Sequence, residues 1–254
     1  MRLTPRQRAS WFAHLFKAAT QQHHGELRSL FAPFIQSEAV VIDIGAHAGQ
    51  FSKLFAKMAR RGRVYAFEPS AYARSIMAPA LRLNRIGNVT LMPLGLSDTA
   101  QTLTLHTPLK RSGALGFGIA HLGGEAAGAA QIDQSVTLTT LDEFTRAHGL
   151  SRLDLIKADI EGWELRALKG GEATLRRFMP ALYLEVDAAH LARAGDTPTD
   201  LFEWLGGRGY RGFATPGLKA APRWSGAGDY LFLPSDPALP NSASNIYTVA
   251  LVSP

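Results

Sequence analysis

An acid and two glycines at the end of an apolar run predict a loop that binds a cationic ligand. The run 40–44 contains Asp43 and leads into Gly45 and Gly49. Glycines let the backbone turn tightly and approach a ligand closely. The spacing Asp-x-Gly-x-x-x-Gly differs from the G-x-G-x-x-G of dinucleotide-binding loops. A carboxylate also repels pyrophosphate but accepts hydrogen bonds from a cationic amino-acid group, such as that of S-adenosylmethionine. The alternative is that Asp43 only caps the following helix. The predicted cofactor loop comprises Asp43, Gly45, Ala46, His47 and Gly49.

A second acid stands at the interval expected of a residue that binds a ribose. Glu68 ends the apolar run 64–67 and is followed by Pro69. An acid about 20 residues beyond the first loop glycine can accept hydrogen bonds from both ribose hydroxyls of an adenosine ligand. We therefore expect Glu68 and Pro69 to border the cofactor. A cap on the next helix is the competing interpretation.

A third apolar run, 89–94, leads to Ser97 and Asp98, which fall where the crevice of such a sheet would hold an adenine. Ser-Asp is also an ordinary turn signal, so this assignment is open. The alternating residues 102–105 indicate a hairpin. The glycine-rich segment 108–135 predicts a mobile loop that could cover a substrate, with plain disorder as the alternative.

Two later apolar runs also end in acids, which predicts a catalytic group. The run 153–158 ends at Asp159 and continues to Glu161, and the run 181–184 ends at Glu185. Ligands of parallel α/β sheets bind outside the carboxyl ends of the strands, so these acids should share the crevice of the cofactor loop. The candidate catalytic residues are Lys157, Asp159, Glu161, Glu185 and His190, and Asp159 is also a candidate cofactor contact.

Asp159 and Glu185 are expected to meet beside the cofactor's methyl group, where two carboxylates would repel each other. Protonation of one of them, or a bound Mg²⁺, would relieve the repulsion. In the metal version, Asp159 and Glu185 are metal ligands that help to lower the pKa of an acceptor hydroxyl. In the metal-free version, Asp159 takes the proton, Lys157 offsets its charge and Glu185 binds substrate. Both versions stay open, because a sequence fixes no distances.

The composition favours a single α/β domain. The chain has 254 residues, of which 46% are hydrophobic, which is enough for one sizeable core. It has no cysteine, so disulfides and thiolate metal sites are excluded. No apolar run has membrane-spanning length and no signal-peptide segment is evident, so we expect a cytoplasmic protein. The net charge of +6 comes without a long basic run, which makes nucleic acid an unfavoured partner.

Terminal segments flank the expected core, 39–233. In the N-terminal appendage, 1–38, the apolar residues within 11–16 recur with helical spacing and one apolar face. We expect this helix to pack on the domain's own sheet. It could instead lie on a membrane or join two subunits as a homodimer. The tail, 234–254, carries no motif.

Five motifs within residues 39–233 carry a family resemblance. They are Asp43-Ile-Gly-Ala-His-Ala-Gly49, Glu68-Pro69, Gly95-Leu-Ser-Asp98, Thr140-Leu-Asp142 and Leu155-Ile-Lys-Ala-Asp-Ile-Glu-Gly-Trp-Glu-Leu-Arg-Ala-Leu-Lys-Gly170. The first motif is shared by many methyltransferases, and the last is much more specific. Together they resemble the FkbM family of S-adenosylmethionine-dependent methyltransferases, with His47 where that family usually has asparagine.

The resemblance implies an α/β, Rossmann-like class I methyltransferase fold. Its sheet would be mostly parallel and seven-stranded, with an antiparallel edge strand. The two late runs, 210–214 and 229–233, could form that antiparallel edge. The implied activity is methylation of a hydroxyl on a sugar, polysaccharide or secondary metabolite.

Three other functions compete with that reading. A ribose 2′-O-methyltransferase acting on nucleic acid would pair a lysine with an aspartate, as Lys157 and Asp159 could. An NAD-dependent oxidoreductase is disfavoured by the missing G-x-G-x-x-G. A binding module that kept the fold but lost its chemistry would hold cofactor without turning over an acceptor.

Overall fold

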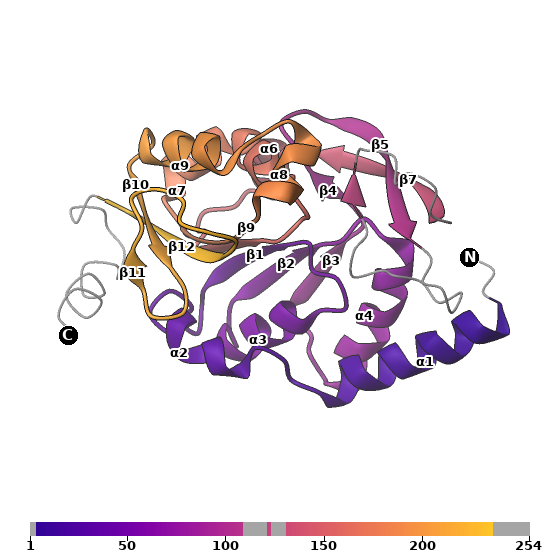
Figure 1. Ribbon diagram of the computed structural model, residues 1–254. Helices are drawn as coiled ribbons and strands as arrows, with labels where there is room; N and C mark the ends of the chain where they lie inside the picture. The colour runs from indigo at the N-terminus through magenta and orange to yellow at the C-terminus, as the bar shows by residue number, and fades with distance from the viewer. Residues whose placement is uncertain (1–3, 109–120, 123–130, 236–254) are drawn as a thin grey trace.

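A mixed sheet forms the centre of the protein, of which the computed structural model describes residues 4–108, 121–122 and 131–235. Its strands are β1 (Val40–Ile44), β2 (Arg63–Phe67), β3 (Val89–Met92), β8 (Leu155–Ala158), β9 (Ala181–Val186), β10 (Tyr210–Ala214), β11 (Lys219–Ala220) and β12 (Gly228–Pro234). Their order is β11-β10-β12-β9-β8-β1-β2-β3 (Figure 1). The five strands from β3 to β9 run parallel, and β12 runs antiparallel to both of its neighbours.

The predicted, mostly parallel sheet with an antiparallel edge is confirmed, because the late runs form β10 and β12, which pair antiparallel near one edge of the sheet. β12 lies between β9 and β10, and the two-residue β11 adds an eighth strand beyond β10. Residues 230–234 of β12 are all buried. A strand paired on both sides and covered on both faces reads as a continuous apolar run, which is the pattern of β12.

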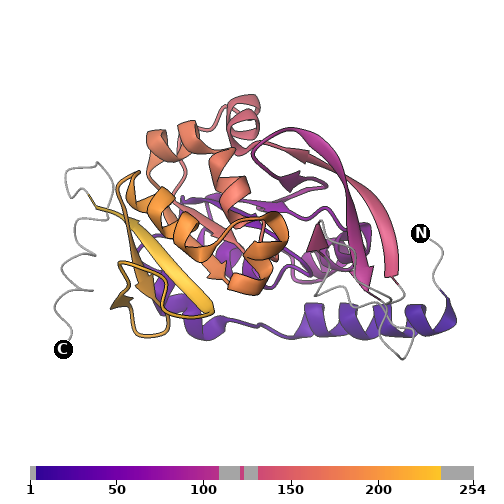
Figure 2. The same cartoon turned by 45° about the horizontal axis from the view of Figure 1, so that its top comes forward.

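Helices cover both faces of the sheet (Figures 1 and 2). One layer contains α2 (Arg28–Phe31), α3 (Gln50–Met58) and α4 (Ala71–Leu83), and the other contains α5 (Leu141–Ala147), α6 (Glu164–Lys169), α7 (Glu172–Phe178), α8 (Ala188–Ala194) and α9 (Pro198–Gly206). Successive side chains of β1 point to opposite layers. Ile42 and Ile44 join the core under α6, and Val41 joins the core with α3. Asp43 is therefore on the α3 side of the sheet.

A second, four-stranded sheet extends from the end of β3. It consists of β4 (Gly95–Leu96), β5 (Gln101–Pro108), β6 (His121–Leu122) and β7 (Gln131–Thr139), in the order β4-β7-β5-β6. The predicted hairpin is present, because β5 pairs antiparallel with β7. The predicted loop 108–135 was too long: residues 131–135 belong to β7, where they pair with β5, and 121–122 form β6. Most of its remainder lies outside the described residues.

The N-terminal helix, α1 (Pro5–Thr20), packs on α4 of the same chain rather than directly on the sheet. Trp11 Nε1 donates to Ser75 Oγ of α4 at 2.9 Å. Pro79 lies within α4, and the helix continues through it to Leu83. In the ranges that the structure describes, no helix is long and apolar enough to cross a membrane.

Candidate active site

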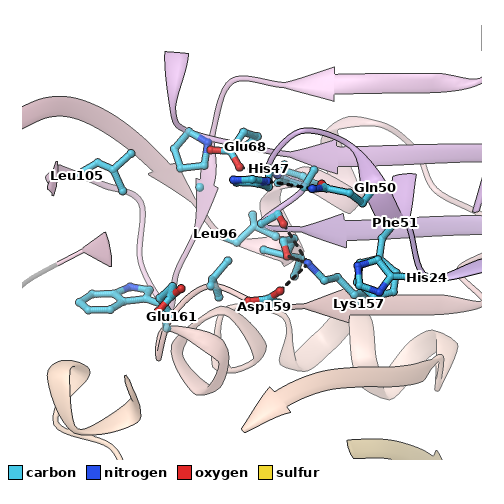
Figure 3. Close-up of a pocket in the computed structure, with 18 residues that line it drawn as sticks. His24, His47, Gln50, Phe51, Glu68, Leu96, Leu105, Lys157, Asp159 and Glu161 are labelled. Atoms are coloured by element: carbon cyan, nitrogen blue, oxygen red, sulfur yellow. Dashed lines mark hydrogen bonds and ion pairs between the residues drawn. The ribbon is translucent and has the colours of Figure 1, made fainter. Parts of the chain in front are cut away.

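A cavity lies at the carboxyl ends of β1, β2 and β8 (Figure 3). Parallel α/β sheets usually bind their ligands at this edge. Eight of the residues predicted from the sequence line it, and they come from three separate loops. They are Gly45, Ala46, His47, Glu68, Pro69, Lys157, Asp159 and Glu161.

The other predicted residues lie behind the cavity wall or beside it. They are Asp43, Gly49, Ser97, Asp98, Glu185 and His190. Asp43 is fully buried, and its Oδ2 accepts a hydrogen bond from Ser52 of α3. Its Oδ1 lies 3.5 Å from the ammonium of Lys157. Asp43 therefore supports the loop from inside, and it does not line the cavity.

The loop after β1 is held against the loop after β8 by a close backbone contact. Gly45 has φ +74°, and a Cβ at this position would lie 2.0 Å from the carbonyl oxygen of Asp159. Only glycine fits such an approach. His47 also has positive φ, 52°, a conformation in which asparagine and histidine are both enriched. Burial lowers the pKa of His47 to about 4, so its imidazole is neutral at pH 7.

Glu68 ties the ends of β1 and β2 together. Its Oε2 accepts the backbone N–H of His47 at 2.7 Å, and its Oε1 accepts that of Ser70 at 2.8 Å. Burial raises the pKa of Glu68, and the two N–H donors act in the opposite direction. Each carboxylate oxygen can still accept a second hydrogen bond, for example from a ribose hydroxyl.

Lys157 is a buried cation between the two loops. Its Nζ donates to the carbonyl oxygens of Gly45, at 3.0 Å, and Ile44, at 3.3 Å. It also lies 3.6 Å from Asp159 Oδ2. Burial alone would lower the pKa of Lys157, but the carboxylates of Asp159 and Asp43 outweigh it and raise that pKa. Lys157 therefore stays charged and cannot act as a base at neutral pH.

Asp159 and Glu185 meet, as the sequence predicts. Their side chains are hydrogen-bonded, and Asp159 opens on the cavity. Burial, followed by the charge of Asp159, raises the pKa of Glu185 to about 8. Burial would also raise the pKa of Asp159, but Lys157 and the hydrogen bond from Glu185 lower it overall. At pH 7, Glu185 is therefore protonated and donates a hydrogen bond to the Asp159 carboxylate.

Glu161, which also lines the cavity, and His190 lie beside this pair. His190 Nδ1 lies 3.3 Å from Glu161 Oε2 and 3.8 Å from Glu185 Oε2. Gly162 has φ +106°, and a Cβ there would lie 2.0 Å from the carbonyl oxygen of His190, so the loop after β8 rests on the start of α8. Glu164 holds this loop by accepting the N–H groups of Ile160, at 2.8 Å, and Gly162, at 3.3 Å.

Two other motif segments have structural contacts. Ser97 Oγ accepts the indole N–H of Trp163 at 3.2 Å, and Trp163 lines the cavity. Asp98 lies 3.9 Å from Arg166. Asp142 accepts the N–H groups of residues 173 and 174 at the start of α7.

Two aromatic rings that the sequence did not predict form a wall of the cavity. His24, from the N-terminal segment, stacks on Phe51 of α3 with ring centroids 4.1 Å apart and planes 9° apart. The ammonium of Lys157 lies 5.3 Å from the Phe51 centroid. In the sequence, Phe51 has the spacing of an ordinary core residue of a helix, and no motif predicts that His24 lies next to it.

The predicted magnesium site finds no support in the residues that the structure describes. Among them, no group of three or more His, Asp or Glu side chains is arranged to hold a metal ion. Asp159 and Glu185 are hydrogen-bonded to each other.

Similarity to known proteins identifies the family. Residues 43–211 match the methyltransferase FkbM domain. The chain is 29% identical over 161 residues to methyltransferase sdnD of Sordaria araneosa, which covers 54% of this chain and 61% of that protein. It also resembles the crystal structure of methyltransferase FkbM from Methylobacillus flagellatus KT, with a TM-score of 0.50 and 15% identity over 90% of this chain and 59% of that one. The chain thus spans about three fifths of each. Because the family match covers more than half of the sequence, the chain belongs to the FkbM family of methyltransferases, which implies S-adenosylmethionine as the methyl donor.

Proposed function

We propose that this protein methylates a hydroxyl group of a sugar, polysaccharide or secondary metabolite. The observation that carries the proposal is the Asp159 carboxylate, which opens on the cavity between the Lys157 ammonium and the Glu185 carboxyl. A carboxylate in this position can accept a hydrogen bond from a hydroxyl and then take its proton. Lys157 and Glu185 keep Asp159 ionised until that transfer.

The residues near Glu68 fit the methyl donor. Bound S-adenosylmethionine would supply an electrophilic methyl group on a sulfonium. Glu68 offers an acceptor oxygen to each ribose hydroxyl, and the apolar side chains of Leu96, Leu105 and Trp163 offer an enclosure for the base. The backbone of Gly45 can approach the amino-acid part without a side chain in between.

The opposite part of the cavity fits an acceptor. Figure 3 shows Asp159 and Lys157 between Glu68 on one side and the His24–Phe51 stack on the other. Aromatic faces suit the C–H face of a sugar ring or the ring of a metabolite. The Asp159 carboxylate would then receive the hydroxyl proton as the oxygen bonds to the methyl carbon. The chain's contribution is alignment, exclusion of water and acceptance of that proton.

Two measurements in sequence test the proposal. S-adenosylmethionine or its demethylated product should raise the melting temperature, because a ligand at 100 times its dissociation constant adds about 2.7 kcal/mol of stability. A shift with NAD and none with either molecule would overturn the cofactor assignment. Acceptor extracts are then incubated with a methyl-labelled donor, and label in a glycan or metabolite supports the proposal. Label confined to RNA, or no label despite cofactor binding, contradicts it.

The same assay distinguishes the metal-free mechanism from the mechanism that uses a bound Mg²⁺. Methyl transfer should persist in EDTA if Asp159 accepts the proton without a metal. Loss of activity in EDTA with recovery on adding Mg²⁺ or Mn²⁺ would contradict the metal-free version.

A further inference from the structure

Large apolar side chains are exposed together on the α1–α4 pair. Phe12 and Phe16 of α1 are 65% and 70% exposed, and Leu83 at the end of α4 is 67% exposed. Among the described residues, the other large hydrophobic side chain in this class is Ile132, at only 38%. Three such residues on two adjacent helices suggest a surface that binds a partner.

The packing of α1 leaves Phe12 and Phe16 facing outward. Trp11, Leu15 and Ala18 contact α4, and Phe12 and Phe16, one turn apart, lie outside this contact. Leu83 continues the stripe of α4 that faces α1, one turn beyond Ala80. Both views place α1 along the outer edge of the molecule (Figures 1 and 2). These side chains contribute nothing to the cavity.

The charged side chains on α1 and α4 are all basic. Neither α1 nor α4 contains an Asp or Glu residue. Exposed basic residues lie on both helices or directly after α4: Arg6, Arg8, Lys17, Arg82 and Arg85. A second copy bound symmetrically here would bring two sets of cations together, which opposes the homodimer considered from the sequence. An anionic surface would neutralise them.

We propose that the α1 face, defined as Phe12, Phe16 and Leu83 with the five basic residues around them, binds an anionic lipid bilayer. The aromatic rings would enter the boundary between head groups and acyl chains, and the basic side chains would contact lipid phosphates. Binding of this kind is peripheral and reversible. The inference is independent of the acceptor and of the proposed chemistry.

Vesicle flotation tests the proposal with the full chain. The protein should float with vesicles of phosphatidylcholine and phosphatidylglycerol, and much less with phosphatidylcholine alone. Phe12→Ser with Phe16→Ser should lower the partition coefficient by about tenfold or more. Arg6→Gln, Arg8→Gln and Lys17→Gln should each lower it up to about fivefold. Ile132→Ser, an exposed apolar change outside the face, is the matched control and should float normally.

Unchanged circular dichroism and an unchanged S-adenosylmethionine melting shift establish that each variant is folded. The proposal is overturned if the wild-type protein binds neither vesicle at low salt, or if the Phe12/Phe16 variant floats as well as wild type. It is also overturned if sedimentation shows the wild-type protein to be a dimer and the Phe12/Phe16 variant to be a monomer. Binding of single-stranded RNA without vesicle binding would point to a different polyanion and would equally refute it.

Discussion

At the scale of single residues, the site depends on how three ionisable side chains share two charges. Lys157 is cationic, Asp159 is anionic, and Glu185 carries a proton at neutral pH because burial and Asp159 raise its pKa to about 8. The unit is close to neutral, which allows it to be partly buried. Asp159 is the member of this unit that can contact an acceptor hydroxyl while Glu185 lies behind it.

Replacing Asp159 by asparagine should remove the proton acceptor and leave the cavity in place. Methyl transfer should fall by roughly a hundredfold or more in kcat, the usual contribution of general-base catalysis. The affinity for S-adenosylmethionine, measured by calorimetry, should change little, since Asn keeps the shape of the side chain. Asp187→Asn is a suitable control, because Asp187 follows β9 as a helix cap and does not line the cavity. Near-normal turnover of Asp159→Asn would remove Asp159 from the mechanism.

Titration of Glu185 should limit activity at alkaline pH. A carboxyl whose pKa is raised is neutral below that pKa, so Glu185 is a hydrogen-bond donor below about pH 8 and a second anion above it. The kcat of the wild type should therefore decline above pH 8, as repulsion displaces Asp159. Glu185→Gln stays neutral and keeps an N–H donor, so its kcat should hold to higher pH. Identical pH profiles for the two proteins would refute this role.

At the scale of elements, the site exists because two loops approach each other without a side chain between them. The loop after β1 meets the loop after β8 at Gly45, and the loop after β8 meets α8 at Gly162. β1 and β8 pair in parallel, with Asp43 opposite Lys157. The two loops that follow them therefore begin at the same edge of the sheet, next to each other. The most specific motif of the sequence therefore encodes packing of loops as well as chemistry.

Alanine at Gly45 should separate these loops. The alanine would be strained by the positive φ. Its Cβ would also lie 2.0 Å from the carbonyl oxygen of Asp159, a backbone atom that cannot move aside. Gly195→Ala is the matched control, since Gly195 has φ +80° and nothing within 4 Å. Urea unfolding should show Gly45→Ala to be less stable than Gly195→Ala by roughly 1–3 kcal/mol, the usual cost of overpacking. Equal stability of the two variants would mean that the close contact is not important.

At the scale of the whole molecule, the N-terminal segment is part of the site. It precedes the residues that match the family, yet it brings His24 onto Phe51 at the end of the cavity that we propose for the acceptor. The segment is fixed there by Lys53, whose ammonium donates to the carbonyl oxygens of Ala18 and Gln21. A part outside the family core can therefore influence which acceptor is bound.

His24→Ala should weaken acceptor binding selectively. An aromatic contact contributes about 0.5–1.5 kcal/mol, so the KM for the acceptor should rise about two- to tenfold. The dissociation constant of S-adenosylmethionine should stay the same, because Glu68 and Gly45 are untouched. His23→Ala provides the comparison, since His23 is adjacent in sequence but does not line the cavity. Equal effects of both changes on KM would argue against the stack as an acceptor contact.

Local pattern predicted most of the central sheet. Runs such as 40–44 and 210–214 coincide with β1 and β10, because buried strands are short, apolar and bounded by glycine or charge. The extent of β7 was missed, since its first residues are polar and only their pairing with β5 makes them a strand. The order of β10 and β12 at the antiparallel edge, and the short eighth strand β11, were not predicted, because sequence order does not reveal which neighbours a late strand will find.

The sequence by itself determined the family, the glycine loop after β1 and the acids at the strand ends, because glycine spacing and strand-end chemistry are local properties of the chain. Only the tertiary structure decided which acids are catalytic candidates. Asp43 and Asp159 both lie at or near the end of an apolar run in the sequence. In the structure Asp43 is buried against α3, whereas Asp159 lines the cavity. The hydrogen bond between Asp159 and Glu185, and the placement of His24 on Phe51, arise from residues far apart in the chain. Such pairings depend on distance in the folded protein, and distance is what the order of residues does not contain.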